Sequence, residues 1–424
     1  METRGVRRAS VFAAALVALA WLALPAWSAE ESAALRERHA LALNDVTGDQ
    51  TITGEVKILL DDRAEAKKLL AAAMAIARVE GQPFNYNAAS ILARVAQDLK
   101  DLEAGQAFYR ICIDKAAKLK SANKLALSYA GIVDLLYENK KYDEALRVCR
   151  EILELKGDED LLRRDGRMRR LKDIVLDTMI QALGKQGKTD EALKLVNNQL
   201  KVRPDDWRVL EIKAVVLHDA GRNTQAAKTY EQVLDRIGKD DSLEQEEKSG
   251  LQGACRYILS GLYAEMDQVD KAAEQLKTLL DQKPNNPTYN NDLGYIWADH
   301  DIHLDEAEKM IRKAIDEERK ERKRNPDLKP TDDRDNAAFL DSLGWVLFKQ
   351  KKLPEAKKYL EDAVKDKDEG QHTEIYDHLG DVNMALGDKA QAVSAWKKAL
   401  DLARKSKRDQ ERKLKIEKKI KEAK

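Results

Sequence analysis

A short pattern that ends in Ala recurs along most of this chain, and it constrains the fold more than any other feature. Segments with one larger residue, two mostly polar residues and then Ala occur at residues 142–145, 189–192, 223–226, 269–272 and 353–356. Looser copies bring the number of such alanines to eight, spaced 34 to 49 residues apart. They are Ala104, Ala145, Ala192, Ala226, Ala272, Ala307, Ala356 and Ala392. Self-similarity of this length indicates one supersecondary unit stacked many times.

The pattern resembles the tetratricopeptide repeat, a helix–turn–helix of about 34 residues. Three Leu-Gly pairs, at residues 293–294, 343–344 and 379–380, place Gly where the two helices of such a repeat cross. The resemblance covers about residues 85–403, and one extra residue falls in the turn at residues 299–303. Repeats then start near Asn85, Ala126, Asp173, Trp207, Gly253, Pro287, Ala337 and Thr373. The resemblance implies an all-α fold, a right-handed α-solenoid of about eight stacked helix hairpins.

The composition agrees with a helical protein. Charged residues make up 35% of the chain and aromatic residues only 5%. This excludes a multi-span membrane protein, and the scarcity of β-branched and aromatic residues argues against a β-rich fold. The three cysteines, Cys112, Cys149 and Cys255, are scattered, so we interpret them as small buried residues rather than as disulfide partners or metal ligands.

The first 28 residues have the build of a secretory signal peptide. Three arginines in the first eight residues precede an uncharged apolar run at residues 11–24, and small residues follow at 26–28. We expect cleavage after Ser28. The alternative is an uncleaved N-terminal membrane anchor, although the run of 14 residues is shorter than the roughly 20 that span a bilayer.

Four segments are therefore predicted: a signal peptide at 1–28, a lead-in segment and capping helix at 29–84, the solenoid at 85–403, and a basic charged helix at 404–424. We expect residues 29–62 to be irregular, because residues 44–54 are polar and Gly-rich. Residues 63–78 are expected to form a lone capping helix.

In a solenoid of this kind, binding takes place on the concave surface, which the first helix of each repeat lines. In the last three repeats the groove positions hold aromatic residues beside carboxylates. These residues are Asn291, Tyr295, Asp341, Trp345, Phe348, Asp377 and Asp381. Exposed aromatics with polar neighbours are typical of protein-binding hot spots, so the sequence predicts a partner-binding groove. The alternative is that an adjacent helix or the charged tail covers these side chains.

The groove does not match one binding mode of the family. Members that dock chaperones hold a peptide's C-terminal carboxylate with Lys and Asn at the fifth repeat position. Here the fifth positions hold no basic residue: they are Ala130, Asp177, Glu211, Tyr257, Asn291, Asp341 and Asp377. The carboxylates favour a basic or polar-aromatic ligand instead.

No arrangement of residues typical of catalysis emerges, so we expect no catalytic residues, no cofactor and no metal. Residues 182–189 approach a phosphate-binding loop, but Ala182 stands where that loop needs its first Gly, and no strand precedes it. The alternative is an enzyme or metal-binding protein with a site near His300 and His303, which lie in a turn beside carboxylates.

The C-terminal tail is strongly basic, with 11 basic and 4 acidic residues at 404–424. We interpret it as a solvated helix that caps the last repeat with Leu414, Ile416 and Ile420 on its inner side. The alternative is peripheral contact with an anionic membrane or cell-wall surface. Nucleic acid is not expected as a partner, because the exported chain is slightly acidic and lacks a basic aromatic surface.

The sequence thus predicts an exported, non-enzymatic scaffold or adaptor, in the periplasm or associated with the cell envelope. Its partners are other proteins or peptides, bound through the concave groove.

Overall fold

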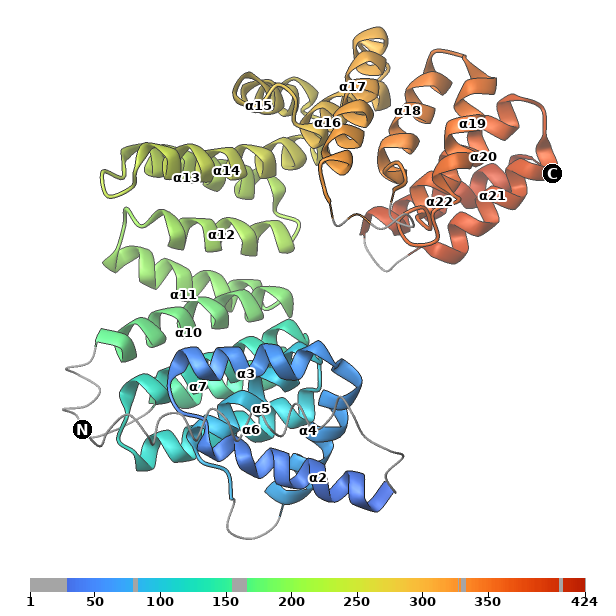
Figure 1. The fold of residues 1–424 in the computed structure, drawn as a ribbon. Helices are drawn as coiled ribbons and strands as arrows, with labels where there is room; N and C mark the ends of the chain where they lie inside the picture. Colours follow the sequence, from blue (N-terminus) through green and yellow to red (C-terminus); the bar gives the residue numbers. More distant parts are fainter. Residues whose placement is uncertain are drawn as a thin grey trace. The chain divides into compact units, whose positions relative to one another are not determined.

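The computed structural model describes residues 29–78, 83–154, 166–326, 328, 333–403 and 407–423. Regular structure in these ranges is entirely helical, without a strand, which confirms the all-α fold class. None of the helices described there is long and apolar enough to cross a membrane. The predicted signal peptide, residues 1–28, lies outside the described residues. The chain divides into two compact units, Met1–Arg222 and Asn223–Lys424 (Figure 1).

The first unit begins with helices where the sequence predicted an irregular lead-in. They are α2 (Ala29–Ala42), the short 3-10 helix η2 (Leu43–Asp45), α3 (Asp49–Asp61) and α4 (Arg63–Ala77). The expectation for residues 29–62 is therefore wrong. Ile52, Val56 and Leu59 are buried on one face of α3, and α3 packs on α5. Burial of this apolar stripe outweighs the weak helix propensity of the Thr and Gly residues between them.

The predicted helix at 63–78 is confirmed as α4, although it is not alone. The Asp62 side chain accepts hydrogen bonds from the backbone N–H groups of Ala64 and Glu65 and so begins the helix. Leu69, Leu70 and Ala73 are buried along α4, which packs on α2, α3 and α5. This four-element cap closes the N-terminal end of the first unit's stacked helices.

The rest of the first unit consists of stacked hairpins. Its helices are α5 (Tyr86–Asp98), α6 (Leu102–Lys118), α7 (Ala122–Glu138), α8 (Tyr142–Glu154), α10 (Gly166–Lys185), α11 (Thr189–Val202) and α12 (Trp207–Asp219). Each of α5, α7 and α10 pairs with the helix that follows it, and α7, α10 and α12 also pack on one another in sequence. In an α-solenoid, the first helix of each hairpin contacts the first helices of the neighbouring hairpins, as it does here.

The second unit repeats this arrangement and ends in a single helix. Its helices are α13 (Asn223–Lys239), α14 (Gln245–Glu265), α15 (Val269–Gln282), α16 (Pro287–Asp299), α17 (Leu304–Lys323), α18 (Ala337–Lys349), α19 (Leu353–Ala363), α20 (Thr373–Ala385), α21 (Lys389–Leu402) and α22 (Lys407–Glu422). The hairpins are α14–α15, α16–α17, α18–α19 and α20–α21, and the first helices α16, α18 and α20 contact one another in that order. α22 packs on α21.

The same backbone conformation ends the first helix of every repeat. A residue with positive φ lies in each turn: Lys100, Lys140, Gly187, Gly221, Asp267, Asp301, Lys351 and Gly387, and the longer turn after Asp301 has a second one, His303. In the first hairpin the N–H of Lys100 bonds to the carbonyl of Gln97, and the N–H of Asp101 bonds to that of Ala96. These two hydrogen bonds form a Schellman motif, which terminates the helix and reverses the chain within a few residues.

The Ala register is confirmed in seven repeats and needs a correction in the first. All eight predicted alanines are buried, and seven of them lie three residues after the start of a second helix, as Ala145 does in α8. In the first repeat α6 starts at Leu102, so the equivalent residue is Gly105 rather than Ala104. A Cβ at Gly105 would lie 2.6 Å from Leu135 Cδ2. The Leu135 side chain of α7 fills the space that a Cβ would take there.

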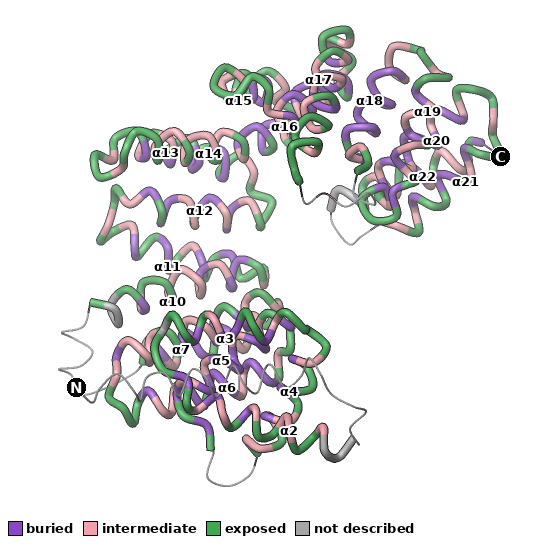
Figure 2. The backbone as a smooth tube through the Cα atoms, in the orientation of Figure 1, coloured by how far each residue is buried: buried purple, intermediate pink, exposed green. Residues whose placement is uncertain are grey.

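Buried residues follow one side of most helices, whereas α18 is buried on all sides from Phe339 to Leu347 (Figure 2). The Leu-Gly pairs lie at close helix crossings, as predicted. A Cβ at Gly294 would lie 2.9 Å from the carbonyl oxygen of Ala307, and one at Gly344 would lie 3.2 Å from that of Ala356. Both contacts join the two helices of a single hairpin, which explains why Gly occupies these positions.

Candidate partner-binding site

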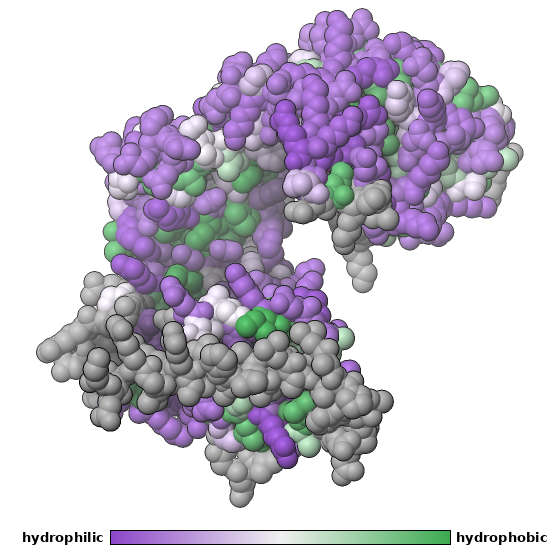
Figure 3. Space-filling view, viewed as in Figure 1, coloured by the Kyte–Doolittle hydropathy of each residue, from purple (hydrophilic) through white to green (hydrophobic). Residues whose placement is uncertain are grey.

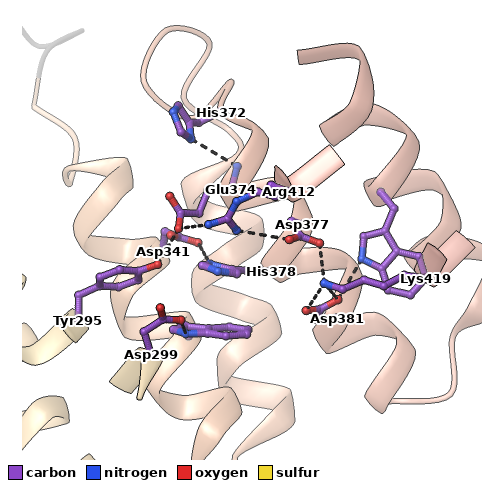
Figure 4. Close-up of polar contacts among 12 residues, drawn as sticks. Tyr295, Asp299, Asp341, His372, Glu374, Asp377, His378, Asp381, Arg412 and Lys419 are labelled. Atoms are coloured by element: carbon purple, nitrogen blue, oxygen red, sulfur yellow. Dashed lines mark hydrogen bonds and ion pairs between the residues drawn. The ribbon is translucent and has the colours of Figure 1, made fainter. Parts of the chain in front are cut away.

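The predicted groove of the last three repeats lies on α16, α18 and α20, and α22 covers the part of it on α20. The Nζ atom of Lys419 lies 2.7 Å from Asp377 Oδ1 and 2.7 Å from both carboxylate oxygens of Asp381. Trp396 of α21 donates its indole N–H to Asp381 over 3.1 Å. α22 therefore contacts the first-helix face of the last hairpin through charge (Figure 4).

Arg412 makes the second contact between α22 and α20. Its guanidinium pairs with Glu374, and its NH1 atom lies 3.3 Å from Asp377 Oδ2. Three carboxylates of α20 thus face two cations of α22. Because burial opposes ionisation, the pKa of Asp381 is raised above its ordinary value, and the charge of Lys419 only partly offsets this rise.

A buried ion pair joins α18 to α20 beside these contacts. The Nδ1 atom of His378 lies 2.9 Å from Asp341 Oδ1, and both side chains are almost fully buried. Burial alone would lower the pKa of His378, but the negative charge of Asp341 and the hydrogen bond between them raise it above 6.5. The imidazolium form is therefore favoured inside the unit.

Aromatic rings fix the position of this pair. The ring of Trp345 stacks on that of His378, with centroids 4.0 Å apart and planes at 13°. The indole N–H donates to Asp299 Oδ1 of α16 over 3.1 Å. On the other side of Trp345, Phe348 stacks at 5.1 Å. Side chains of the three consecutive first helices α16, α18 and α20 are therefore in direct contact.

Tyr295 connects α16 to α20. Its hydroxyl donates to Glu374 Oε1 over 2.6 Å, the carboxylate that also pairs with Arg412. Burial, reinforced by the nearby charge of Glu374, raises the pKa of Tyr295 well above its ordinary value. The phenol therefore stays protonated and acts as a donor.

The expectation of exposed aromatic anchors needs correction. Trp345 is only 9% exposed, and Asn291, Asp341 and Asp377 are also buried. The alternative weighed from the sequence describes the structure, since adjacent helices enclose Trp345 and the tail covers Asp377 and Asp381. The role of these residues in binding a partner stays a prediction.

The capping interpretation of the tail is confirmed in part. Ile416 is fully buried and Ile420 is half-buried in a cluster with Trp396, whereas Leu414 is 68% exposed. Leu414 lies two residues before Ile416 and so points to another side of the helix. Contact of the tail with a membrane or cell-wall surface stays a prediction.

Sequence reasoning missed Glu374, His378, Arg412 and Lys419 as members of this cluster. A signal was available in the spacing, because both the carboxylate pair on α20 and the cation pair on α22 are seven residues apart. Such pairs lie on one side of a helix. Their meeting depends on where α22 docks, which spacing within one helix does not determine.

The two histidines of the alternative site are used for packing and turn formation. His300 Nδ1 lies 2.8 Å from the carbonyl oxygen of Ile296. His303 has a φ of 47°, and its ring packs against that of Trp297 at 5.0 Å with the planes tilted by 54°. Among the described residues, no group of three or more His, Cys, Asp or Glu side chains could hold a metal ion.

Family models match this chain in three places. Models described as Tetratricopeptide repeat match residues 178–242, 337–367 and 373–406. These matches agree with the hairpins and the Ala register described above. The chain is a multi-repeat tetratricopeptide repeat protein.

Relatives and solved structures with such repeats are similar to parts of the protein. The TPR repeat-containing protein PA4667 of Pseudomonas aeruginosa is 27% identical over 181 residues, which is 42% of this chain and 26% of that relative. The match thus spans about a quarter of the relative's length. A tetratricopeptide repeat protein from Parabacteroides merdae has a TM-score of 0.46 at 15% identity and covers 73% of this chain and 98% of its own. The protein TTC0263 of Thermus thermophilus has a TM-score of 0.36 at 19% identity, with 50% and 98% covered.

Proposed function

We propose that this tetratricopeptide repeat protein is an exported, non-enzymatic scaffold that binds other proteins or peptides through the first-helix faces of its hairpins. Tetratricopeptide repeats generally mediate protein–protein interaction, and stacked repeats create extended binding surfaces. The observation that carries the proposal is the contact of α22 with α20. The carboxylates of one first helix already hold a second helix there, through Lys419 and Arg412.

The first unit presents a comparable face on α7, α10 and α12. Leu127 is 59% exposed and Ile174 is 53% exposed, each on the same side of its helix as a carboxylate, Asp134 and Asp177 respectively. Burial raises the pKa of both carboxyls, so part of their hydration shell is already lost. Exposed aliphatic residues beside such carboxylates favour a protein ligand over a small polar one.

A crosslinking experiment in the native cell tests the scaffold function. A photoreactive amino acid replaces Ile174, which faces solvent on a first helix, and in a control replaces Asn197, which is exposed on the second helix of the same hairpin. We expect a small, reproducible set of proteins to crosslink at Ile174 and not at Asn197. Identical patterns at the two positions, or no crosslinks at any first-helix position, would count against a scaffold.

Export is the second part of the proposal, with the protein in the periplasm or associated with the cell envelope. It is supported by the arginines, apolar run and small residues of the first 28 positions. N-terminal sequencing of the protein from fractionated cells should begin at Ala29. Recovery of the intact N-terminus in the membrane fraction would instead favour the uncleaved anchor.

A further inference from the structure

The cations of α22 and the carboxylates of α20 share one spacing. Arg412 and Lys419 are seven residues apart, as are Glu374 and Asp381. Seven residues of α-helix rise about 10.5 Å and return to nearly the same side. Arg412 pairs with Glu374 and Lys419 with Asp381, so the two helices match in register along two turns.

Asp377 links the two ends of this interface. It lies between Glu374 and Asp381 on α20 and contacts both cations, at 3.3 Å from Arg412 and 2.7 Å from Lys419. A single carboxylate that contacts both cations makes the match specific to a helix with this spacing. One mismatched charge would leave a buried carboxylate without a counterion, which is costly.

An aliphatic residue completes the pattern on α22. Ile416 lies four residues after Arg412 and three before Lys419, is fully buried, and packs in one cluster with Trp396 of α21. The opposite side of α22 faces solvent, as the 77% exposed side chain of Lys418 shows. The surface of the second unit is mostly hydrophilic in the view of Figure 3. The side of α22 that contacts the hairpin therefore carries Arg, Ile and Lys at positions i, i+4 and i+7.

The last hairpin shares its hydrophobic cluster with α22, through Ile416 and Ala423. α20 and α21 pack extensively on each other, with Val382, Ala392 and Ala399 fully buried. Among the described residues of α22, only Ile416 and the adjoining Ala423 are buried. α22 is thus held by few apolar side chains and by the charges of Arg412 and Lys419. Salt and competing cations weaken interactions of that kind.

We infer that the surface formed by Glu374, Asp377, Asp381 and Trp396 is a docking site for a basic amphipathic helix of a partner protein. This inference rests on the proposed scaffold function. The partner helix carries Arg, an aliphatic residue and Lys at positions i, i+4 and i+7. In the free protein α22 occupies the site, and the partner helix displaces it. Charge complementarity selects the partner, because the site presents three carboxylates and the ring of Trp396.

A labelled synthetic peptide with the sequence of residues 407–423 tests this inference by fluorescence anisotropy against the full chain. Because α22 competes at the high effective concentration of a tethered ligand, the wild type should bind the peptide weakly. The variant Arg412→Ala/Lys419→Ala should bind it at least about tenfold more tightly. The matched control Lys415→Ala/Lys418→Ala loses the same charge from exposed positions and should bind like the wild type.

Two further peptides separate the docked pattern from net charge. One carries Glu in place of Arg412 and Lys419, and the other carries Glu in place of Lys415 and Lys418. Only the second should bind the Arg412→Ala/Lys419→Ala variant. Equal binding of both peptides would show that only non-specific charge attraction holds them, and would overturn the inference. Lys419→Met, a single change that keeps an apolar stem, provides a second variant if the double change lowers helicity measured by circular dichroism.

The oligomeric state decides whether another copy is the natural occupant. Sedimentation of the wild type at rising concentration should show a monomer in the absence of peptide. A dimer that dissociates on Arg412→Ala/Lys419→Ala would mean that copies exchange α22, and would overturn the assignment to a different partner.

Crosslinks at Ile174 without peptide binding would refute the docking site and leave the scaffold function standing. Peptide binding without any cellular crosslink would refute the scaffold function and leave the docking site standing.

Discussion

The Nζ atom of Lys419 lies 2.7 Å from both carboxylate oxygens of Asp381. One residue comes from the last helix of the protein and the other from the first helix of the last hairpin. Burial raises the pKa of Asp381, and Lys419 counteracts that rise. The charge on the carboxylate and the docking of α22 are therefore coupled, since each is less favourable without the other.

Lys419→Ala should loosen α22 without unfolding the unit. The change leaves the carboxylate of Asp381 largely buried, with a hydrogen bond from the Trp396 indole but without its cation, which costs about 1–2 kcal/mol. Hydrogen exchange should become faster at the amides of residues 410–422 and stay unchanged in α16 and α18. Lys418→Ala is the control, because Lys418 is exposed and pairs only with Glu422 of its own helix. Equal acceleration in both variants would contradict a specific role for Lys419.

His378→Asn should destabilise the second unit far more strongly. The change removes the partner of the buried Asp341 carboxylate and the ring stacked on Trp345. Removing one member of a buried ion pair costs about 3–5 kcal/mol. Urea denaturation followed by Trp fluorescence measures the loss. His372→Asn is a suitable comparison, because His372 lies at the exposed start of α20 and its ring accepts only a capping hydrogen bond from Glu374 N.

The same ion pair should make stability depend on pH. The pKa of His378 in the folded unit lies above its ordinary value of 6.5, so folding favours the protonated ring. The stability it contributes is full below about pH 6.5 and is lost as the pH rises through the folded pKa. Asp341, Glu374, Arg412 and Asp381 are the charged groups that interact with the ring. The difference in unfolding free energy between the wild type and His378→Asn should shrink as the pH rises above about 6.5, and a constant difference would contradict the prediction.

The hairpins could be predicted from the sequence because their signals are local. A small residue such as Ala307 or Gly294 is required wherever two helices of one hairpin cross closely, and that requirement recurs with each repeat. α3 could not be predicted, because its helix depends on packing Ile52 and Val56 against α5. A polar, Gly-containing segment has no local preference strong enough to reveal such a helix.

The cluster at the end of the chain was predictable in its residue types and not in its pairing. The sequence placed Asp341, Asp377 and Asp381 in the groove of the last three repeats, and in the structure the charges of Asp341 and Asp377 both act on Arg412. The counterions of Asp377 and Asp381 are Arg412 and Lys419, more than 30 residues away, so the pairing depends on tertiary packing. Trp345 was expected to be exposed because repeat position alone does not show that Asp299 and His378 enclose it.

The three cysteines should be inert in the folded protein. Cys112, Cys149 and Cys255 are buried and are not in disulfides, and burial raises the pKa of the Cys112 and Cys149 thiols to about 12. Because the thiolate is the reactive form, a thiol reagent such as Ellman's reagent should label the native protein negligibly at pH 8. Full labelling should appear after unfolding in guanidinium chloride. Rapid labelling of the native protein would contradict the burial of these side chains.

Gly294→Ala and Gly261→Ala should change stability in opposite directions. A Cβ at Gly294 would lie 2.7 Å from Ile311 Cγ1 and 2.9 Å from the backbone oxygen of Ala307, so α16 and α17 would have to separate. Overpacking of this kind costs about 1–3 kcal/mol. Gly261 lies in the interior of α14 with no atom within 4 Å of the added methyl. Ala there should stabilise the unit by about 0.5–1 kcal/mol, because it restricts the unfolded chain and favours helix. Thermal unfolding of both variants measures the contrast, and a loss of stability from both would show that α14 does not tolerate a side chain at this position.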